Sequence, residues 1–145
     1  SDTLKQNLAK YLNQFRLVSD AIDILDATIV NIGLKYSVTI EKGYRSEIVL
    51  AAVNGKLIDY FDTKNFQINK PVVIGELENL ILNTSGVVSI ISLDVLSRAG
   101  IENNRLYNGF SFDAKQNIDR GMLFPPVGGI FEVKYPNFDI SGRVV

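Results

Sequence analysis

The sequence predicts an α+β fold, in which a small antiparallel sheet is covered on one face by helices and followed by a loop-rich C-terminal β extension. Apolar residues alternate with mostly polar ones from Thr28 to Ile40 and again over 87–97. Two segments with helical spacing, 45–61 and 74–83, lie between them. A strand, two helices and a returning strand leave the strands antiparallel, with both helices free to cover one face.

The chain opens on an amphipathic pattern that predicts a helix over about 3–14. A side-chain oxygen of Asp2 or Thr3 can cap its first turn. Because the sequence begins almost directly on this helix, we expect the chain to be a fragment of a longer protein. The apolar stripe consists of Leu4, Leu8, Tyr11, Leu12 and Phe15.

Three carboxylates spaced by three, Asp20, Asp23 and Asp26, follow this predicted helix. On a helix, this spacing would gather them on one side, as in a Ca²⁺ or Mg²⁺ site or an acid–base pair. Isolated Asp residues also cap helices and form turns, and the Gly and Glu positions of an EF-hand loop are missing. We favour the capping and turn roles, and we predict no bound metal or cofactor.

The segment 45–61 combines helical spacing with an Asn54-Gly55 pair, which is a strong hairpin signal between apolar runs. A glycine inside a helix costs about 1 kcal/mol. The flanking residues do not alternate, so we predict a helix, and its two apolar stripes indicate burial on much of its circumference. The stripes are Ile48, Ala51, Ala52 and Ile58, and Leu50, Val53, Leu57 and Phe61.

The remaining elements are shorter. Phe66 and Ile68 alternate as a possible strand, and the helix over 74–83 ends at Ser85-Gly86, since glycine is common just past a helix C-terminus. Residues 98–126 have the composition of loops, with one short strand predicted over 107–112. A strand over 130–135 and a last strand or ordered tail over 140–145 complete the extension. We expect a single domain, with 1–97 as its core and 98–145 as the extension.

The composition excludes several classes of function. The 145 residues include no Cys and no His, which excludes disulfides, thiolate nucleophiles, Cys or His zinc sites and Ser-His-Asp triads. Fifteen basic and sixteen acidic residues without a basic stripe argue against a nucleic-acid partner. No apolar run approaches the roughly 20 residues that cross a bilayer. We expect a soluble, intracellular domain that is not an enzyme and has no membrane partner.

Two other functions stay open. Tyr36, Phe110 and Phe112 could form a platform on which the bases of single-stranded RNA stack, as in small ferredoxin-like modules. Tyr36, however, lies in the apolar register of its strand, and the basic residues that accompany such platforms are missing. An enzyme that uses Asp or Glu acid–base chemistry is the second alternative, because carboxylates far apart in sequence can meet in space.

Several stretches together carry a resemblance to a known family. They are residues 11–21, 26–33, 48–61, 85–87, 131–136 and 139–145. The sequence resembles the C-terminal region of the baseplate wedge proteins (gene product six) of T-even-like contractile-tailed phages, within the wider baseplate-J-like family. The resemblance spans nearly the whole chain and is weakest over 98–126.

This resemblance implies a structural virion protein, assembled in the host cytoplasm, whose C-terminal domain dimerises and links wedges into the ring of the tail baseplate. The implied partners are a second copy and other baseplate wedge subunits. A homodimer uses one patch twice about a two-fold axis. We predict that the patch draws on residues of the extension without an obvious core face. The alternative is that these residues seal the open end of the core. They are Tyr107, Phe110, Phe112, Leu123, Phe124 and Phe131.

Overall fold

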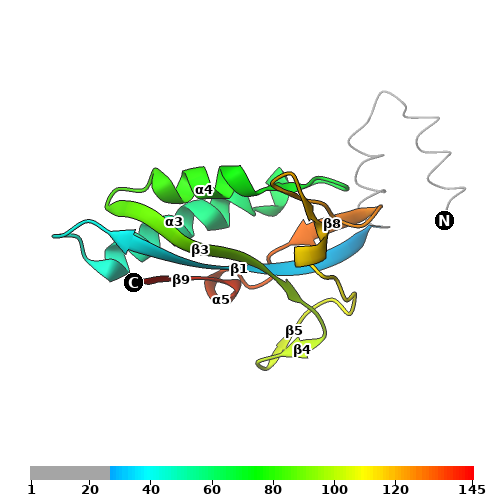
Figure 1. Cartoon of the computed structure of the whole chain (residues 1–145). Coiled ribbons are helices and arrows are strands. Elements are labelled where there is room, and N and C mark those ends of the chain that lie inside the picture. Colours follow the sequence, from blue (N-terminus) through cyan, green and yellow to red (C-terminus); the bar gives the residue numbers. More distant parts are fainter. Residues whose placement is uncertain (1–26) are drawn as a thin grey trace, which may run out of the picture.

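The computed structural model describes residues 27–145, so the helix predicted over 3–14 and the carboxylates of Asp20, Asp23 and Asp26 lie outside the described residues. The α+β class is confirmed. A long strand, β1 (Thr28–Ile40), crosses the molecule, and α3 (Ser46–Tyr60) and α4 (Ile74–Leu82) lie together on one face of its sheet (Figure 1). These elements match the predicted order of strand, helix and helix.

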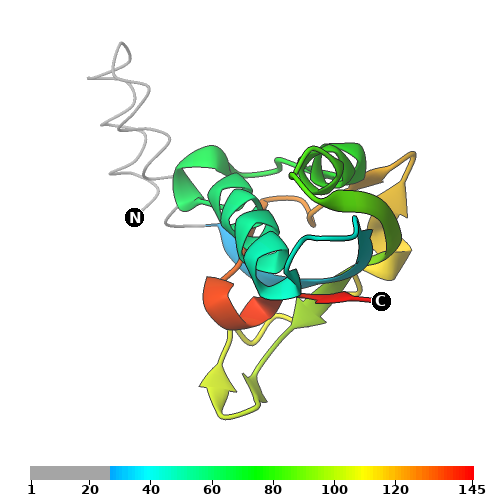
Figure 2. The same ribbon diagram turned by 90° about the vertical axis from the view of Figure 1, so that its left-hand side faces the viewer.

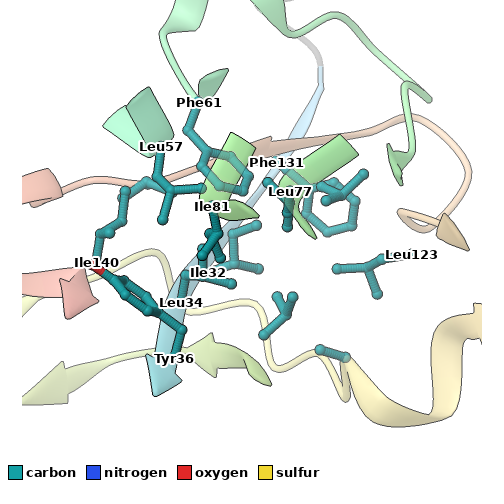
Figure 3. Close-up of a cluster of buried hydrophobic side chains, with 14 of the residues drawn as sticks. Ile32, Leu34, Tyr36, Leu57, Phe61, Leu77, Ile81, Leu123, Phe131 and Ile140 are labelled. Carbon is teal, nitrogen blue, oxygen red and sulfur yellow. The ribbon is translucent and has the colours of Figure 1, made fainter. Parts of the chain in front are cut away.

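The core lies between β1 and the two helices. Alternate residues of β1 have no or almost no exposed surface, as expected for one buried face with a period of two. Figure 3 shows Ile32 and Leu34 in a cluster with Leu57 of α3 and with Leu77 and Ile81 of α4. The buried residues of β1 on this face are Val30, Ile32, Leu34, Tyr36 and Val38.

The sheet is mixed rather than wholly antiparallel. Strand β3 (Val87–Arg98) pairs antiparallel with one edge of β1, as predicted. On the other edge, β8 (Gly129–Glu132) and β9 (Ile140–Val144) pair with β1 in parallel, one after the other. The short helix α5 (Pro136–Asp139) joins them. The expectation of an antiparallel sheet therefore holds only for the β1–β3 pair, because alternation indicates a strand but not its direction.

Helix α3 buries the predicted stripe of Leu50, Val53, Leu57 and Phe61 fully or partly, but most of the other predicted stripe is exposed, so burial on much of its circumference is wrong. Val49, Val53 and Leu57 face the core at a spacing of four residues. Ile48 has 59% of its surface exposed, and Ala51 and Ala52 are exposed as well. The reason is geometric: the sheet and α4 contact one side of α3, and no other element of the described chain covers the outer side.

The Asn54-Gly55 pair lies inside α3 and not in a hairpin. Asn54 faces the sheet, where its Oδ1 accepts a hydrogen bond of 2.6 Å from the hydroxyl of Tyr36. A buried tyrosine hydroxyl needs such a partner. Burial also raises the pKa of Tyr36 above its ordinary value. Asn54 is thus explained by a residue of another element and not by the local sequence.

The predicted strand at Phe66 and Ile68 is wrong, because this part of the chain forms η1 (Thr63–Asn65) and a turn. Phe66 is buried and stacks on the ring of Phe61 with the two centroids 5.6 Å apart. The next strand, β2 (Val72–Val73), joins a small sheet of the extension. Phe66 therefore closes the core instead of alternating across a sheet.

The extension forms two small hairpins in place of the strand predicted over 107–112. Strands β4 (Ile101–Glu102) and β5 (Arg105–Leu106) turn at two Asn residues with positive φ, which is the geometry of tight hairpin turns. After η2 (Lys115–Asn117), β6 (Ile118–Asp119) and β7 (Met122–Leu123) form the second hairpin, which pairs with β2. The strand predicted over 107–112 is wrong, since this stretch lies between the two hairpins.

Candidate self-association surface

The six residues predicted for an interface have different surroundings in the fold. Leu123 and Phe131 are buried in the core, and Tyr107 is buried on the opposite face of the sheet. Phe112 is partly buried and packs edge-on against Phe131, with the ring centroids 5.7 Å apart. Phe110 and Phe124 each keep 39% of their surface exposed. Sealing of the core thus describes Leu123, Phe131 and Phe112, whereas Tyr107 is buried outside the core and Phe110 and Phe124 keep exposed surface.

Tyr107 belongs to a polar cluster on the outer face of the sheet, away from the helices. Its hydroxyl donates a hydrogen bond of 2.6 Å to Oδ1 of Asp139, a carboxylate with no exposed side-chain surface. The backbone N–H of Tyr135 donates to Oδ2 of Asp139 at 3.2 Å, and Nε of Arg98 lies 3.5 Å from Oδ1. The buried charge is thus compensated by one cation and two donors.

A second part of the cluster holds the extension against β1. The side-chain amide of Asn31 donates to Glu132 on β8 at 2.8 Å, and its carbonyl oxygen accepts from the backbone N–H of Asn108 at 2.6 Å. Gly33 leaves room for α5, because a Cβ there would lie 2.9 Å from the backbone oxygen of Asp139. The extension therefore covers the polar face of β1 around Asn31 and Gly33, and we assign the cluster a structural role.

The surroundings of this cluster change the pKa of Tyr107. The pKa of Tyr107 is raised to about 12, mainly because burial disfavours the phenolate, and the hydrogen bond and negative charge of Asp139 raise it further. The phenol is consequently neutral and acts as a donor throughout the physiological range. Nothing in this arrangement prepares a nucleophile or a base, since the carboxylate is engaged and shielded from solvent.

Strand β3 lies at an edge of the main sheet. Within residues 27–145 it pairs only with β1, along its whole length of 12 residues. Near its C-terminal end the extension lies alongside, where the backbone N–H of Ala114 donates to Oγ of Ser97 at 3.1 Å. The N-terminal half has no such neighbour among the described strands. Long uncovered edges favour association with another chain, and proteins often interrupt them with bulges.

Two bulges occur in this half of β3. The register with β1 passes from Ser92 to Ile90 and from Ser89 to Val87, so Ile91 and Val88 are left without partners. Both are exposed aliphatic residues, with 59% and 61% of their surfaces accessible. A bulge breaks the regular ladder and redirects a side chain. The edge is therefore poorly suited to adding a flat strand, but it presents two apolar side chains.

Neighbouring segments add apolar surface to these bulges. The ring of Tyr44 lies over Gly86, where a Cβ would come within 2.6 Å of a ring carbon, and the backbone N–H of Glu41 donates to the oxygen of Gly86 at 2.7 Å. The turn after β1 is thereby fixed beside the start of β3. Helix α4 ends at Leu82, shortly before β3 begins at Val87. We name the exposed residues Tyr44, Leu82, Val88 and Ile91 the edge surface; each has between 45% and 61% of its surface accessible.

The sequence contained a signal for this surface that strict alternation missed. Residues 87–92 read Val-Val-Ser-Ile-Ile-Ser, in which apolar pairs replace single apolar positions. A strand with one buried face alternates singly, so each pair requires an additional residue in the strand. The pairs indicate the two bulges, and the second member of each pair is the exposed one.

A polar hollow of about 270 Å³ lies on the outer face of β3, β1 and β9. Its charged residues are Lys35, Asp94 and Arg143, and all three side chains are exposed. The volume is below the range of about 300–1,000 Å³ that is typical of small-molecule sites. We assign no ligand to it, because charges of both signs that are open to solvent do not select one.

Two further observations on the described residues concern the RNA-binding and the acid–base enzyme alternatives. Tyr36 is 1% exposed and Phe112 packs in the core, so these two rings do not form a stacking platform with Phe110. Over 27–145, no group of three or more Asp or Glu side chains is arranged to hold a metal ion. None of the helices in the same range is long and apolar enough to span a membrane.

Comparison with known proteins identified no relative of this chain. Neither the protein families nor the curated proteins that were compared with the chain gave a match. A functional proposal therefore rests on the geometry described above and on the resemblance of the sequence. Of the surfaces described, the edge surface combines an unpaired strand edge with exposed apolar side chains, and we take it as the candidate functional site.

Proposed function

We propose that this chain is a structural domain that forms a homodimer through the edge surface. The observation that supports this proposal is the placement of Val88 and Ile91, two exposed aliphatic residues on bulges of an edge strand. Tyr44, whose ring lies beside Gly86, and Leu82, at the end of α4, are further exposed apolar residues near the start of β3 in the chain or the fold. A two-fold axis would bring this surface against its own copy and cover both edges at once.

The size of this surface limits the expected affinity. Full burial of a large aliphatic side chain is worth about 1.5–3 kcal/mol, and the members of the edge surface are already partly buried in the monomer. Association itself costs at least about 4 kcal/mol in lost freedom of motion. We therefore expect a dissociation constant in the micromolar range, so self-association must be measured up to high micromolar concentrations.

In its biological setting, we propose that the dimer joins neighbouring wedge subunits in the tail baseplate of a contractile-tailed phage. The resemblance to the C-terminal region of baseplate wedge proteins supports this part of the proposal. A connector acts through shape and apolar contact and needs no reacting group. Other wedge subunits would be its further partners, and the virion its location.

Light scattering on the purified chain tests the dimer directly. Wild type should approach twice the monomer mass of 16.1 kDa as its concentration rises to high micromolar. Ile91→Asp should stay monomeric, because a carboxylate at the centre of an apolar interface is costly to desolvate. The matched control is Ile101→Asp, which changes an even more exposed isoleucine on the β4–β5 hairpin and should dimerise like wild type.

A second pair of variants distinguishes the edge surface from the extension. Phe110→Asp and Phe124→Asp alter the two exposed aromatics of the extension and leave β3 unchanged. We expect both to dimerise. A dimer that survives Ile91→Asp but is lost in Phe110→Asp or Phe124→Asp would move the interface to the extension. A wild-type chain that remains monomeric at every concentration would refute the proposed function.

A further inference from the structure

An apolar hollow of about 220 Å³ opens beside the first residues of β1. Phe66 and Phe131 are almost fully buried and form its inner wall, while Thr63 is exposed at its rim. The rings of Phe61 and Tyr60 pack behind Phe66, so this wall is supported by an aromatic cluster. The residues that line the hollow are Ile29, Thr63, Phe66, Ile130, Phe131 and Glu132.

The dimensions of the hollow favour side chains over a free small molecule. Its volume is below the range of about 300–1,000 Å³ in which small-molecule sites are usually found. Four of its six lining residues are apolar, and neither Thr63 nor Glu132 is a buried polar group that would orient a ligand. A pocket of this kind accepts one or two large apolar side chains from a peptide segment.

The sequence supplies such a segment immediately upstream. We propose that the apolar stripe of the chain's own residues 4–15 docks in this hollow. The stripe repeats at helical spacing and carries aromatic and leucine side chains of suitable size. An apolar stripe of this length favours a covering surface over exposure to water. The hollow includes Ile29, so it lies where the N-terminal part of the chain enters the fold.

The connection is long enough to permit docking in the same molecule. Thirteen residues separate Phe15 from Ile29, and an extended chain spans about 3.3–3.6 Å per residue. Tethering also gives the stripe a high effective concentration, typically in the millimolar range for short flexible connections. Docking within one chain is therefore favoured over docking on a second copy. The hollow shares no residue with the edge surface, so this inference is independent of the proposed dimer.

A spin-label experiment tests the docking on the full chain. Because the sequence has no Cys, a single Thr63→Cys substitution accepts one nitroxide label at the rim of the hollow. The amide signals of residues 4–15 in a ¹⁵N spectrum should lose most of their intensity when the label is paramagnetic and regain it on reduction. The control label, at Lys42→Cys, lies beyond the far end of β1, about 40 Å along the strand, and should leave these signals unchanged.

Variants of the stripe make the test specific. Leu8→Ser with Leu12→Ser should abolish the broadening from the Thr63 label, whereas Gln6→Ser with Asn13→Ser, on the polar side of the pattern, should preserve it. Broadening that is equal for both label positions, or that persists in the Leu8 and Leu12 variant, would overturn the proposal. So would broadening seen only between ¹⁵N-labelled wild type and an unlabelled, spin-labelled second copy, because the segment would then dock on a partner.

Discussion

At the scale of single residues, the contact between Tyr107 and Asp139 links the extension to the main sheet. Asp139 is fully buried beside Gly33 of β1, and Tyr107 follows the β4–β5 hairpin 32 positions earlier in the chain. The same carboxylate binds the backbone N–H of Tyr135 and faces Arg98 of β3. The carboxylate of Asp139 thus connects a strand, a hairpin and a short helix. Loss of any of these contacts should weaken the attachment of the extension to the main sheet.

We predict that Tyr107→Phe destabilises the protein by about 1–3 kcal/mol, because a buried carboxylate loses a hydrogen-bond donor. The ionisation of Tyr107 adds a pH dependence. Its folded pKa of about 12 lies above the ordinary value of 10.0, so its contribution is complete below pH 10 and is lost as the pH rises through 12. Urea unfolding of wild type should therefore show falling stability above pH 10.

The variant provides its own control for this pH dependence. Tyr36 has a raised pKa as well and is present in both proteins, so some loss at high pH should remain in Tyr107→Phe. The additional loss of stability that the ionisation of Tyr107 causes in wild type should be absent from the variant. Equal pH profiles for the two proteins would show that Tyr107 does not titrate as its burial demands.

At the scale of elements, β9 packs beside β1 because a small residue of one strand lies opposite a large residue of the other. Gly142 of β9 lies opposite Tyr36 of β1, and a Cβ at this glycine would overlap the tyrosine ring. The ring can lean over β9 and reach Asn54 of α3 only because Gly142 has no side chain. The parallel pairing of β9 with β1 thus depends on one glycine.

We predict that Gly142→Ala destabilises the protein by about 1–3 kcal/mol, the usual cost of inserting a carbon into a packed core. Gly55→Ala is the matched control. No atom lies within 4 Å of a Cβ at Gly55, and alanine in a helix is more favourable than glycine by roughly 0.5–1 kcal/mol. Thermal unfolding should show a lower midpoint for the first variant and a higher one for the second. Equal midpoints would mean that Tyr36 can move aside.

The main elements could be predicted from local sequence, and the connections among them could not. The single alternation of β1 and the spacing of α4 are set by residues a few positions apart, so their bounds were predicted closely. The role of Asn54 depends on Tyr36, 18 positions away, and the direction of β8 and β9 depends on their pairing with β1. Strict alternation does not indicate the candidate site, because the bulges in β3 show in the sequence only as pairs of apolar residues.

At the scale of the whole molecule, the sheet separates two kinds of surface. The helices cover one face, and α5 and the β4–β5 hairpin lie on the other side (Figure 2). Both faces of β1 are therefore used within the monomer. The N-terminal half of β3 has no strand neighbour on its outer edge among the described strands and carries two exposed aliphatic residues, which is why we place association at this edge of the sheet and not on its faces.

Amide hydrogen exchange at two protein concentrations tests the central claim most directly, because it reports both whether the chain associates and where. We predict that exchange over 41–44 and 82–91 slows when the concentration rises from low to high micromolar. Exchange over 107–124 should stay unchanged. Exchange that is independent of concentration throughout the chain, or that slows over 107–124 and not over 82–91, would contradict association through the edge surface.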